Sequence, residues 1–346
     1  MTLIGEIHEQ PDCLERLLKS GRPAVEEIAR AIRARGIRYV FVAARGTSEN
    51  AARYANYVWG AFNGLPVALA TPSLFTCYRR PPVLQDALVV GISQSGRSPD
   101  IVSVPAEGRR QGCLTLAITN AVGSPLAEAA DFVLDIRSGP ENAVAATKTY
   151  TGQLMAIAML SAALSGEESR WQELQRVPEW LNAALELDEA AGILAQRHRA
   201  LARCVVLGRG FNFATAYEWA LKLKELTYVE AEPYSSADFL HGPIAMVDTG
   251  FPVLAVISRG SVWGSMFELL QKLRDVCSAD LVVVSDAEEA LELASSGSLA
   301  LPRGVPEWLT PLVSIAPAQL FAYHLALAKG RNTESPRGIH KITETS

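Results

Sequence analysis

The sequence has few cysteines, and their spacing matches neither a disulfide framework nor a metal site. Only five occur among its 346 residues, and no two stand in a C-x-x-C pair. An odd number of widely separated cysteines indicates neither a disulfide framework nor a structural zinc site. We therefore expect five buried thiols, at Cys13, Cys77, Cys113, Cys204 and Cys277.

A basic excess and a long apolar run are also missing. The 32 Lys and Arg against 37 Asp and Glu give a net charge of −5, whereas nucleic-acid-binding proteins carry an excess of basic residues. No apolar run approaches the roughly 20 residues that cross a bilayer. The start, M-T-L-I-G-E-I-H-E-Q, lacks the basic and then apolar order of a signal peptide. We expect a cytoplasmic protein that binds neither nucleic acid nor membranes.

The sequence does contain short apolar runs that alternate with helical patterns. Runs rich in β-branched residues lie at 38–44, 87–92, 114–119 and 132–136, and again at 203–208, 251–257 and 279–285. Amphipathic stretches such as E-N-A-A-R-Y-A-N-Y-V-W-G-A-F separate them. This rhythm is typical of an α/β protein whose parallel sheet lies between helices on both faces.

The alternation occurs twice. R-Y-V-F-V-A-A-R-G-T-S-E-N-A-A-R-Y-A aligns with R-C-V-V-L-G-R-G-F-N-F-A-T-A-Y-E-W-A about 165 positions later, and V-V-G-I-S-Q-S-G aligns with L-A-V-I-S-R-G-S in the same order. Two copies of one domain are the simplest explanation. The expected parts are an N-terminal helical segment (1–27), the first copy (28–165), a connecting helix (166–195), the second copy (196–330) and a C-terminal tail (331–346).

Serine-rich loops follow two strands of the first copy. The stretch G-I-S-Q-S-G-R-S-P-D (91–100) and the shorter R-G-T-S (45–48) would both lie at the carboxyl edge of the sheet, where helix N-termini bind anions. Ser98 is a plausible N-cap with Pro99 at the first helical position. The alternative is that these serines only turn the chain and cap a helix. Neither loop is a Walker or G-x-G-x-x-G motif, which disfavours ATP and NAD.

Eight motifs occur in an order that resembles a known family. They are E-I-H-E-Q-P (6–11), G-T-S (46–48), S-Q-S-G-x-S (93–98), V-A-A-T-K (144–148), L-G-R-G (207–210), E-W-A-L-K-L-K-E (218–225), H-G-P (241–243) and P-R-G-I-H-K (336–341). The chain resembles the double sugar isomerase (SIS) domain family. The likeness is strongest to the isomerase half of glutamine:fructose-6-phosphate aminotransferase (glucosamine-6-phosphate synthase) and to stand-alone SIS-type glucosamine-6-phosphate deaminases. It implies two tandem three-layer, flavodoxin-like α/β/α domains.

The resemblance also implies which residues bind the substrate. Six residues of the serine-rich loops would hold the 6-phosphate of a hexose: Thr47, Ser48, Ser93, Gln94, Ser95 and Ser98. The remaining implied substrate contacts are Arg45, Gly46, Val144, Ala145, Lys222 and His340. No cofactor and no metal are expected.

Glu218, Lys222 and Glu225 are spaced i, i+4, i+7, which places them on one face of a helix. Such a row is ordinarily a ladder of surface salt bridges. The resemblance instead implies that Glu225 is the general base that moves a proton between C1 and C2 of the open-chain sugar.

The resemblance assigns two further catalytic residues. His241 would open the sugar ring, and Lys341 would meet C2 of the sugar from a tail that folds over the site as a lid. By composition alone, His241 would be structural and Lys341 a solvated tail lysine.

The chain departs from the family pattern at several positions. Arg45 stands where the aminotransferases usually have Cys, Ala146 where they have Ser, and Asp238-Phe239-Leu240 precede His241 where they have Glu-x-Lys. These changes leave the sugar uncertain. The sequence also contains no glutaminase domain, so glutamine hydrolysis is not expected.

We therefore expect a phosphosugar isomerase and deaminase that converts glucosamine 6-phosphate to fructose 6-phosphate and ammonia, as a homodimer. Three alternatives remain open. One is action on another substrate, such as galactosamine 6-phosphate or a fructosyl-amine phosphate. Another is the synthetic direction with external ammonia or a separate glutaminase. The third is a sugar-phosphate sensor without catalysis.

Overall fold

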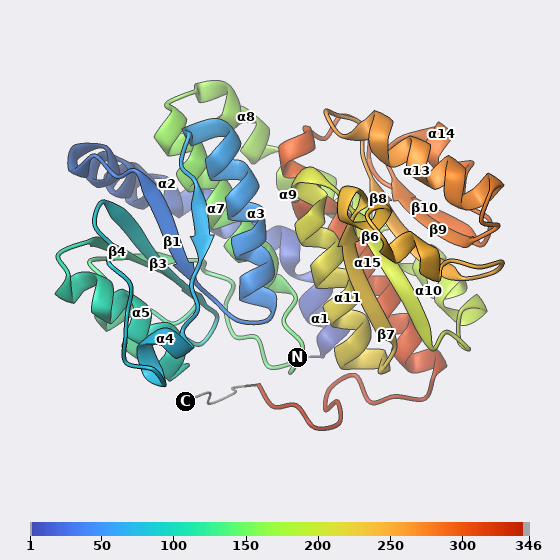
Figure 1. Cartoon of the computed structure of the whole chain (residues 1–346), viewed down its shortest axis with the longest axis horizontal. Helices are drawn as coiled ribbons and strands as arrows, with labels where there is room; N and C mark the ends of the chain where they lie inside the picture. The colour runs from blue at the N-terminus through green and yellow to red at the C-terminus, as the bar shows by residue number, and fades with distance from the viewer. Residues whose placement is uncertain (1, 342–346) are drawn as a thin grey trace. The chain divides into compact units, whose positions relative to one another are not determined.

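A computed structural model describes residues 2–341 of the chain (Figure 1). The described residues form two compact units, and neither is continuous in the sequence. The first unit contains residues 9–142, 146–176 and 340–341. The second contains residues up to His8, residues 143–145 and residues 177–339.

The first unit is built on a parallel five-stranded sheet with the order β2-β1-β3-β4-β5. Its strands are β1 (Tyr39–Ala43), β2 (Val67–Leu69), β3 (Ala87–Ser93), β4 (Leu114–Thr119) and β5 (Phe132–Asp135). Its helices are α2 (Gln10–Arg35), α3 (Thr47–Asn63), α4 (Ser73–Thr76), α5 (Pro99–Arg110), α6 (Pro125–Glu128), α7 (Lys148–Ser165) and α8 (Glu168–Gln175). The central strand β3 is buried at every position, as expected for a parallel strand covered by helices on both faces.

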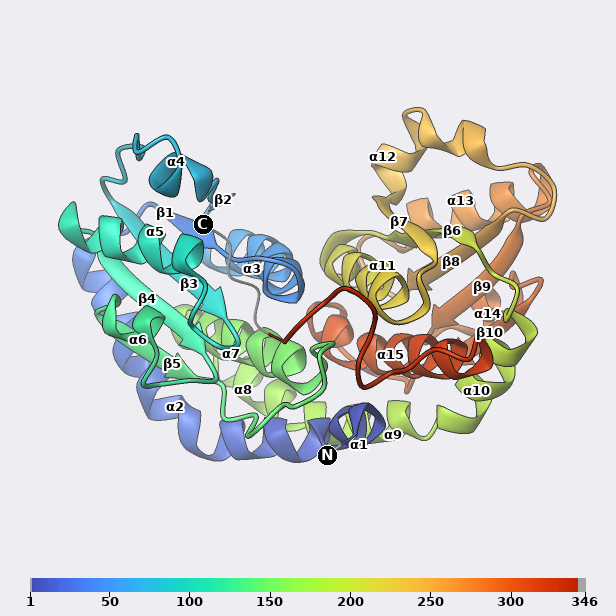
Figure 2. The same ribbon diagram turned by 90° about the horizontal axis from the view of Figure 1, so that it is seen from below.

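The second unit contains another parallel five-stranded sheet, with the order β10-β9-β8-β6-β7. Its strands are β6 (Arg203–Gly208), β7 (Glu230–Ser235), β8 (Pro252–Ile257), β9 (Asp280–Ser285) and β10 (Gly297–Ala300). Its helices are α1 (Leu3–His8), α9 (Val177–Leu185), α10 (Asp188–Arg197), α11 (Phe213–Thr227), α12 (Ser236–Leu240), α13 (Trp263–Asp275), α14 (Glu288–Leu291) and α15 (Thr310–Ala328), with short 3-10 turns η1 (Gly210–Asn212), η2 (Pro243–Met246) and η3 (Glu307–Leu309). Helix α1 lies against α15 and buries Leu3 and Ile7 (Figure 2).

The predicted duplication and fold class are confirmed. Read from its β7 edge, the second sheet has the order β7-β6-β8-β9-β10, which matches β2-β1-β3-β4-β5 of the first sheet strand for strand. All seven predicted strands are present within one or two residues of their predicted ends. Sequence analysis missed β2, β7 and β10, which are edge strands. Edge strands are short or carry charge and proline, as in E-A-E-P-Y-S of β7.

Three expectations need correction. The five cysteines are free, but Cys77 is exposed and Cys277 half-buried, so only Cys13, Cys113 and Cys204 are buried thiols. The stretch Glu307–Ala328, which contains α15, is long and apolar enough to cross a membrane by length and composition, contrary to the expected lack of such a run. It is 78% buried inside the structure, and a core helix of a soluble protein passes the same test. The segment expected as one connecting helix contains α8, α9 and most of α10.

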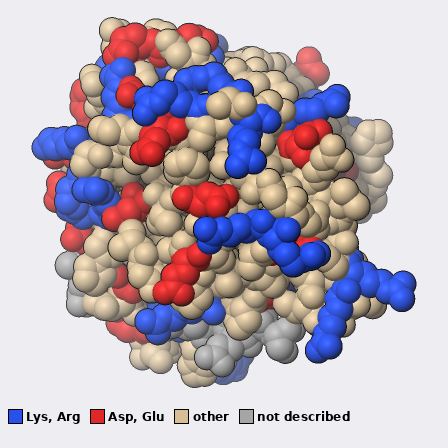
Figure 3. All heavy atoms as spheres, turned by 90° about the vertical axis from the view of Figure 1, so that its left-hand side faces the viewer, with Lys and Arg blue, Asp and Glu red and all other residues tan. Residues whose placement is uncertain are grey.

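Charges of both signs are interspersed on the face shown in Figure 3, where Lys and Arg side chains alternate with Asp and Glu. Ion pairs within the first unit include Arg22 with Glu168 and Arg110 with Glu107. Exposed pairs of this kind contribute little to stability. The visible face therefore has no continuous basic patch of the type that binds nucleic acid.

Candidate functional site

The two serine-rich loops lie at the same edge of the first sheet. Strands β1 and β3 are adjacent and parallel, with Ala43 opposite Gly91 at their carboxyl ends. Helix α3 begins at Thr47 directly after β1, and α5 begins at Pro99 after the loop that follows β3. Two helix N-termini and their hydroxyl groups therefore face one edge, as the sequence predicted. This arrangement favours an anion.

The loop after β3 is a well-defined turn. The N–H of Gly96 donates to the Ser93 hydroxyl over 3.1 Å, and the N–H of Arg97 donates to the Ser95 hydroxyl over 3.4 Å. Gly96 has a φ of 61°, and a Cβ there would lie 2.0 Å from the Ser124 hydroxyl. Only glycine fits this position. The two hydrogen bonds and the close packing against Ser124 define the conformation of the loop.

Ser98 occupies the N-cap position of α5 with Pro99 at the first helical position, as predicted, but its side chain makes no cap hydrogen bond. The expected capping role of this hydroxyl is therefore wrong. A hydroxyl at a helix N-terminus that does not bond its own helix can bond a ligand instead.

Two contacts fix the shorter loop. The guanidinium Nε of Arg45 lies 3.0 Å from Oδ2 of the buried Asp100, in the first turn of α5, so Arg45 links the two loops. The Ser48 hydroxyl accepts a hydrogen bond of 3.0 Å from Nε2 of Gln153 on α7. Sequence analysis missed Asp100 and Gln153. The only sequence signal for the contact between Arg45 and Asp100 was that an arginine follows one strand and an acid follows the neighbouring strand.

The C-terminal tail places Lys341 in the first unit. Its Nζ lies 2.7 Å from Oε2 of Glu141, which is fully buried and precedes the V-A-A-T-K motif. Lys341 is therefore not a solvated tail lysine. Ala145 is buried and Val144 half-buried, whereas His340 is exposed.

Helix α11 carries a buried ionic row in the second unit. Nζ of Lys222 lies 3.3 Å from Glu218 and 2.5 Å from Oε2 of Glu225. Glu218 and Lys222 are fully buried, while the side chain of Glu225 is 24% exposed. The shared helical face is confirmed, and the alternative of a surface ladder is wrong.

The charge state of Lys222 follows from its neighbours. Burial alone would lower the pKa of Lys222, but the adjacent carboxylates of Glu225 and Glu218 outweigh it and hold that pKa above its usual range. Lys222 therefore stays protonated at neutral pH. The hydrogen bond to Glu225 uses Oε2, which leaves Oε1 as the oxygen that can meet a substrate.

Glu225 and His241 of one chain lie at opposite edges of the second sheet. Helix α11 connects the adjacent parallel strands β6 and β7, so it runs antiparallel to them and brings Glu225, in its last turn, to their amino ends. His241 follows the carboxyl end of β7, after α12, and is exposed. The six residues of β7 separate these edges by about 20 Å.

The second sheet does not repeat the open loops of the first. The turn after β8 corresponds to the serine-rich loop after β3, but here the N–H of Ser261 donates to the carboxylate of Glu307 over 2.8 Å. Gly260 makes room for that carboxylate, since a Cβ there would lie 2.2 Å from it. The protein's own anion occupies the place where an external anion would bind.

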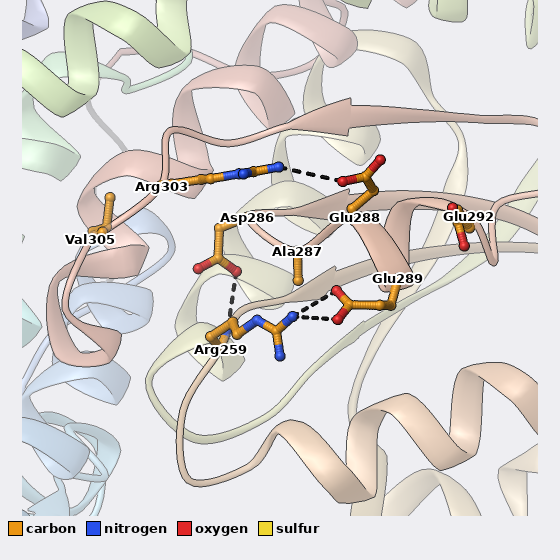
Figure 4. Close-up of a pocket in the computed structure, with 9 residues that line it drawn as sticks. Arg259, Asp286, Ala287, Glu288, Glu289, Glu292, Arg303 and Val305 are labelled. Atoms are coloured by element: carbon orange, nitrogen blue, oxygen red, sulfur yellow. Dashed lines mark hydrogen bonds and ion pairs between the residues drawn. The ribbon is translucent and has the colours of Figure 1, made fainter.

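A pocket of about 620 Å³ lies farther along this edge (Figure 4). Arg259 and Arg303 line it, and they are paired with Glu289 and Glu288. Asp286 and Glu292 add further carboxylates. Four carboxylates against two guanidinium groups disfavour a phosphate, so the candidate phosphate site is the one in the first unit.

Two copies of the SIS domain match the chain, at residues 35–163 and 199–329. The chain therefore belongs to the SIS domain family.

Within the family, it is 33% identical over 98% of its length to a glutamine–fructose-6-phosphate aminotransferase (isomerizing) of Thermus thermophilus, of which the match covers 58%. The chain thus spans little more than half the length of the curated relatives that it matches.

Two solved structures share the whole fold. One is the C-terminal domain of the glucosamine-fructose-6-phosphate aminotransferase of Francisella tularensis, with 26% identity, a TM-score of 0.88, and 96% of this chain and 98% of that chain covered. The other is the glucosamine-6-phosphate deaminase of Thermotoga maritima, with 20% identity, a TM-score of 0.78 and full coverage of both chains. At that identity, the second likeness shows the fold alone.

Replacing Ser98 by Ala tests the role of its hydroxyl. We expect affinity for inorganic phosphate to fall about tenfold, because a hydrogen bond to a charged group is lost, while the melting temperature stays unchanged because the hydroxyl caps nothing. Titration calorimetry and thermal unfolding measure the two effects. Ser124→Ala supplies the stability comparison, since that hydroxyl does accept a cap bond from Ala127. A lower melting temperature with normal affinity for Ser98→Ala would restore the capping role.

Replacing Lys222 by Met should destabilise the protein by about 3 kcal/mol or more, because Glu218 is left buried without its cation. Glu218→Gln combined with Lys222→Met should recover part of that loss by removing the buried charge. Chemical denaturation measures both. Equal stability of Lys222→Met and the parent protein would contradict the buried ionic row.

Proposed function

We propose that the protein is a phosphosugar isomerase that converts glucosamine 6-phosphate to fructose 6-phosphate and ammonia. The observation that supports it most is the ionic row on α11. A lysine buried against two carboxylates is weak evidence for stability, and such groups are frequent where a charged side chain must be held in place for chemistry. The serine-rich loops supply the second requirement, which is recognition of a phosphate.

In the proposed reaction, Glu225 carries the proton transfer. The open-chain amino sugar has an aldehyde at C1 and an amine and a proton at C2. Glu225 removes the C2 proton and returns it to C1, while the carbonyl oxygen at C1 gains a proton and the amine at C2 loses one. The product has a hydroxymethyl group at C1 and an imine at C2, and water hydrolyses the imine to the ketone and ammonia. Lys222 fixes the carboxylate through Oε2, so Oε1 performs both transfers.

The remaining roles follow the resemblance. The residues of the two loops, from Arg45 to Ser48 and from Ser93 to Ser98, hold the phosphate. His241 takes the proton of the anomeric hydroxyl as the ring oxygen leaves, and Lys341 meets C2. Val144, Ala145 and His340 complete the substrate contacts.

A homodimer is part of the proposal. Glu225 and His241 of one chain lie at opposite edges of a sheet, so a reaction that uses both needs His241 from a second copy. The segment around His241 supports this, because Leu240 and Met246 on either side of it are each 45% exposed. Exposed apolar side chains beside a functional residue are typical of an interface.

The opposite direction is the second candidate. The Thermus relative is named an aminotransferase. The synthetic direction is tested by supplying this protein with fructose 6-phosphate and an ammonium salt. Formation of glucosamine 6-phosphate faster than its deamination would favour the synthetic role. Turnover of galactosamine 6-phosphate alone would identify a different sugar as the substrate. Binding of these sugar phosphates without turnover of any of them would indicate a sensor.

Replacing Glu225 by Gln should abolish turnover of glucosamine 6-phosphate, with a loss of at least about 10³-fold in kcat. Affinity for the sugar phosphate should change little, because the phosphate is held elsewhere. Production of fructose 6-phosphate and of ammonia should stop together. Full activity of Glu225→Gln would end the proposal.

Mixing two inactive variants tests the shared site. Glu225→Gln and His241→Asn should each be inactive alone. In mixed dimers, one of the two sites receives both normal residues, so activity should return to about a quarter of the parent value after random exchange. No recovery, with exchange confirmed by mass spectrometry, would place both residues in one chain's site.

A further inference from the structure

The side chain of Glu141 is fully buried in the first unit, and both of its carboxylate oxygens accept hydrogen bonds. Oε1 accepts the N–H of Thr147 over 2.9 Å and the N–H of Thr149 over 3.1 Å, and Oε2 accepts the Thr149 hydroxyl over 2.8 Å. These groups begin α7, whose N-cap residue Thr147 makes no side-chain cap bond of its own. Glu141 therefore caps the N-terminus of α7, where a negative charge is favourable.

Capping α7 does not account for the whole contact. Oε2 also accepts from Nζ of Lys341 over 2.7 Å, a partner 200 residues away in the sequence. The Lys341 side chain is 24% exposed and that of Glu141 is 0% exposed. Hydrogen bonds between two ionised groups are roughly twice as strong as neutral ones, and burial of the carboxylate makes loss of its partner costly.

Side-chain contacts hold the tail in the second unit before the chain reaches Lys341. The carboxylate of Glu334 accepts the N–H of Leu3 over 3.1 Å, and the guanidinium of Arg331 lies over the Tyr228 ring. Residues 331–341 form no helix or strand, so no ladder of backbone hydrogen bonds fixes them. Earlier in the tail, the N–H of Arg337 donates to the Tyr228 hydroxyl over 2.7 Å, and its guanidinium stacks on the Tyr228 ring. That contact lies in the second unit. In the first unit, Lys341 is held by Glu141.

We infer that Glu141 is a positioning residue for Lys341, whose ammonium it holds at the start of α7. The inference rests on the role proposed for Lys341 at C2 of the sugar. A group that must meet one carbon atom needs a defined position, because a shift of about 1 Å can cost 100-fold in rate. The two backbone N–H groups of the cap use Oε1, whereas Oε2 accepts the positioning contact from Lys341 and the Thr149 hydroxyl. A substitution that changes only one of the two oxygens can therefore separate the two roles.

Glu141→Gln separates them. The amide oxygen can still accept the backbone N–H groups of Thr147 and Thr149, so α7 keeps these two cap bonds. The amide nitrogen replaces Oε2, where it donates to the Thr149 hydroxyl instead of accepting from it and faces the ammonium of Lys341. We expect hydrogen exchange of residues 336–341 to rise about tenfold or more, with exchange at the start of α7 unchanged. Lys341→Met should release the tail equally. Glu168→Gln, which removes a surface partner of Arg22 in the same unit, should leave the tail at the parent value.

Kinetics give the second readout. With glucosamine 6-phosphate, Glu141→Gln should lower kcat by about 10- to 100-fold with little change in KM. Glu141→Gln should cause no further loss of kcat in the Lys341→Met background, because both changes remove the same interaction. Glu141→Asp, which keeps the charge, should recover part of the loss.

The outcomes separate this inference from the proposed function. Unchanged tail exchange in Glu141→Gln overturns the inference, and so do multiplicative losses of kcat in the double variant. No turnover by the parent protein overturns the proposed function, and tail exchange still tests the contact. Full activity of Lys341→Met, with a released tail, removes Lys341 from the proposed chemistry and supports the contact itself.

Discussion

The direction of the parallel strands decides where the functional side chains of this protein lie. Because β1 and β3 point the same way, the loops after them end at one edge and present hydroxyl groups together. Because α11 must run back between two parallel strands, it carries Glu225 to the opposite edge from His241. The same constraint that brings the two serine-rich loops together in the first unit places Glu225 and His241 of one chain at opposite edges of the second sheet.

The two sheets of the duplicated domain differ in the loops at their carboxyl edges. The first keeps open loops of serine and glycine, while the second fills the corresponding turn with the carboxylate of Glu307. The buried charges follow the same division. Lys222 in the second unit and Glu141 in the first are both fully buried and paired. A hydrophobic residue of similar size is often as stable as a buried ion pair, so positions of this kind are better explained by chemistry than by folding.

The fold was predictable because strong periodic patterns repeat. Buried strands such as L-T-L-A-I-T at 114–119 are visible as apolar runs, and the i, i+4, i+7 spacing placed Glu218, Lys222 and Glu225 on one face. The burial of that face was not predictable, because three charged residues on one face of a helix normally indicate that the face is exposed to solvent. Glu141 was missed for a related reason: its partner is 200 residues away, and no local pattern records a contact between a loop and a tail. Edge strands such as β7 were missed because they are short or carry charge and proline.

A crystal structure of the protein with glucosamine 6-phosphate would test the central claim most directly. The account predicts one sugar phosphate per chain, with its phosphate on the serine-rich loop between Ser93 and Ser98 and its C1 and C2 facing Oε1 of Glu225. A phosphate bound instead at the turn of Gly260, or a sugar whose C2 lies far from Glu225, would contradict it.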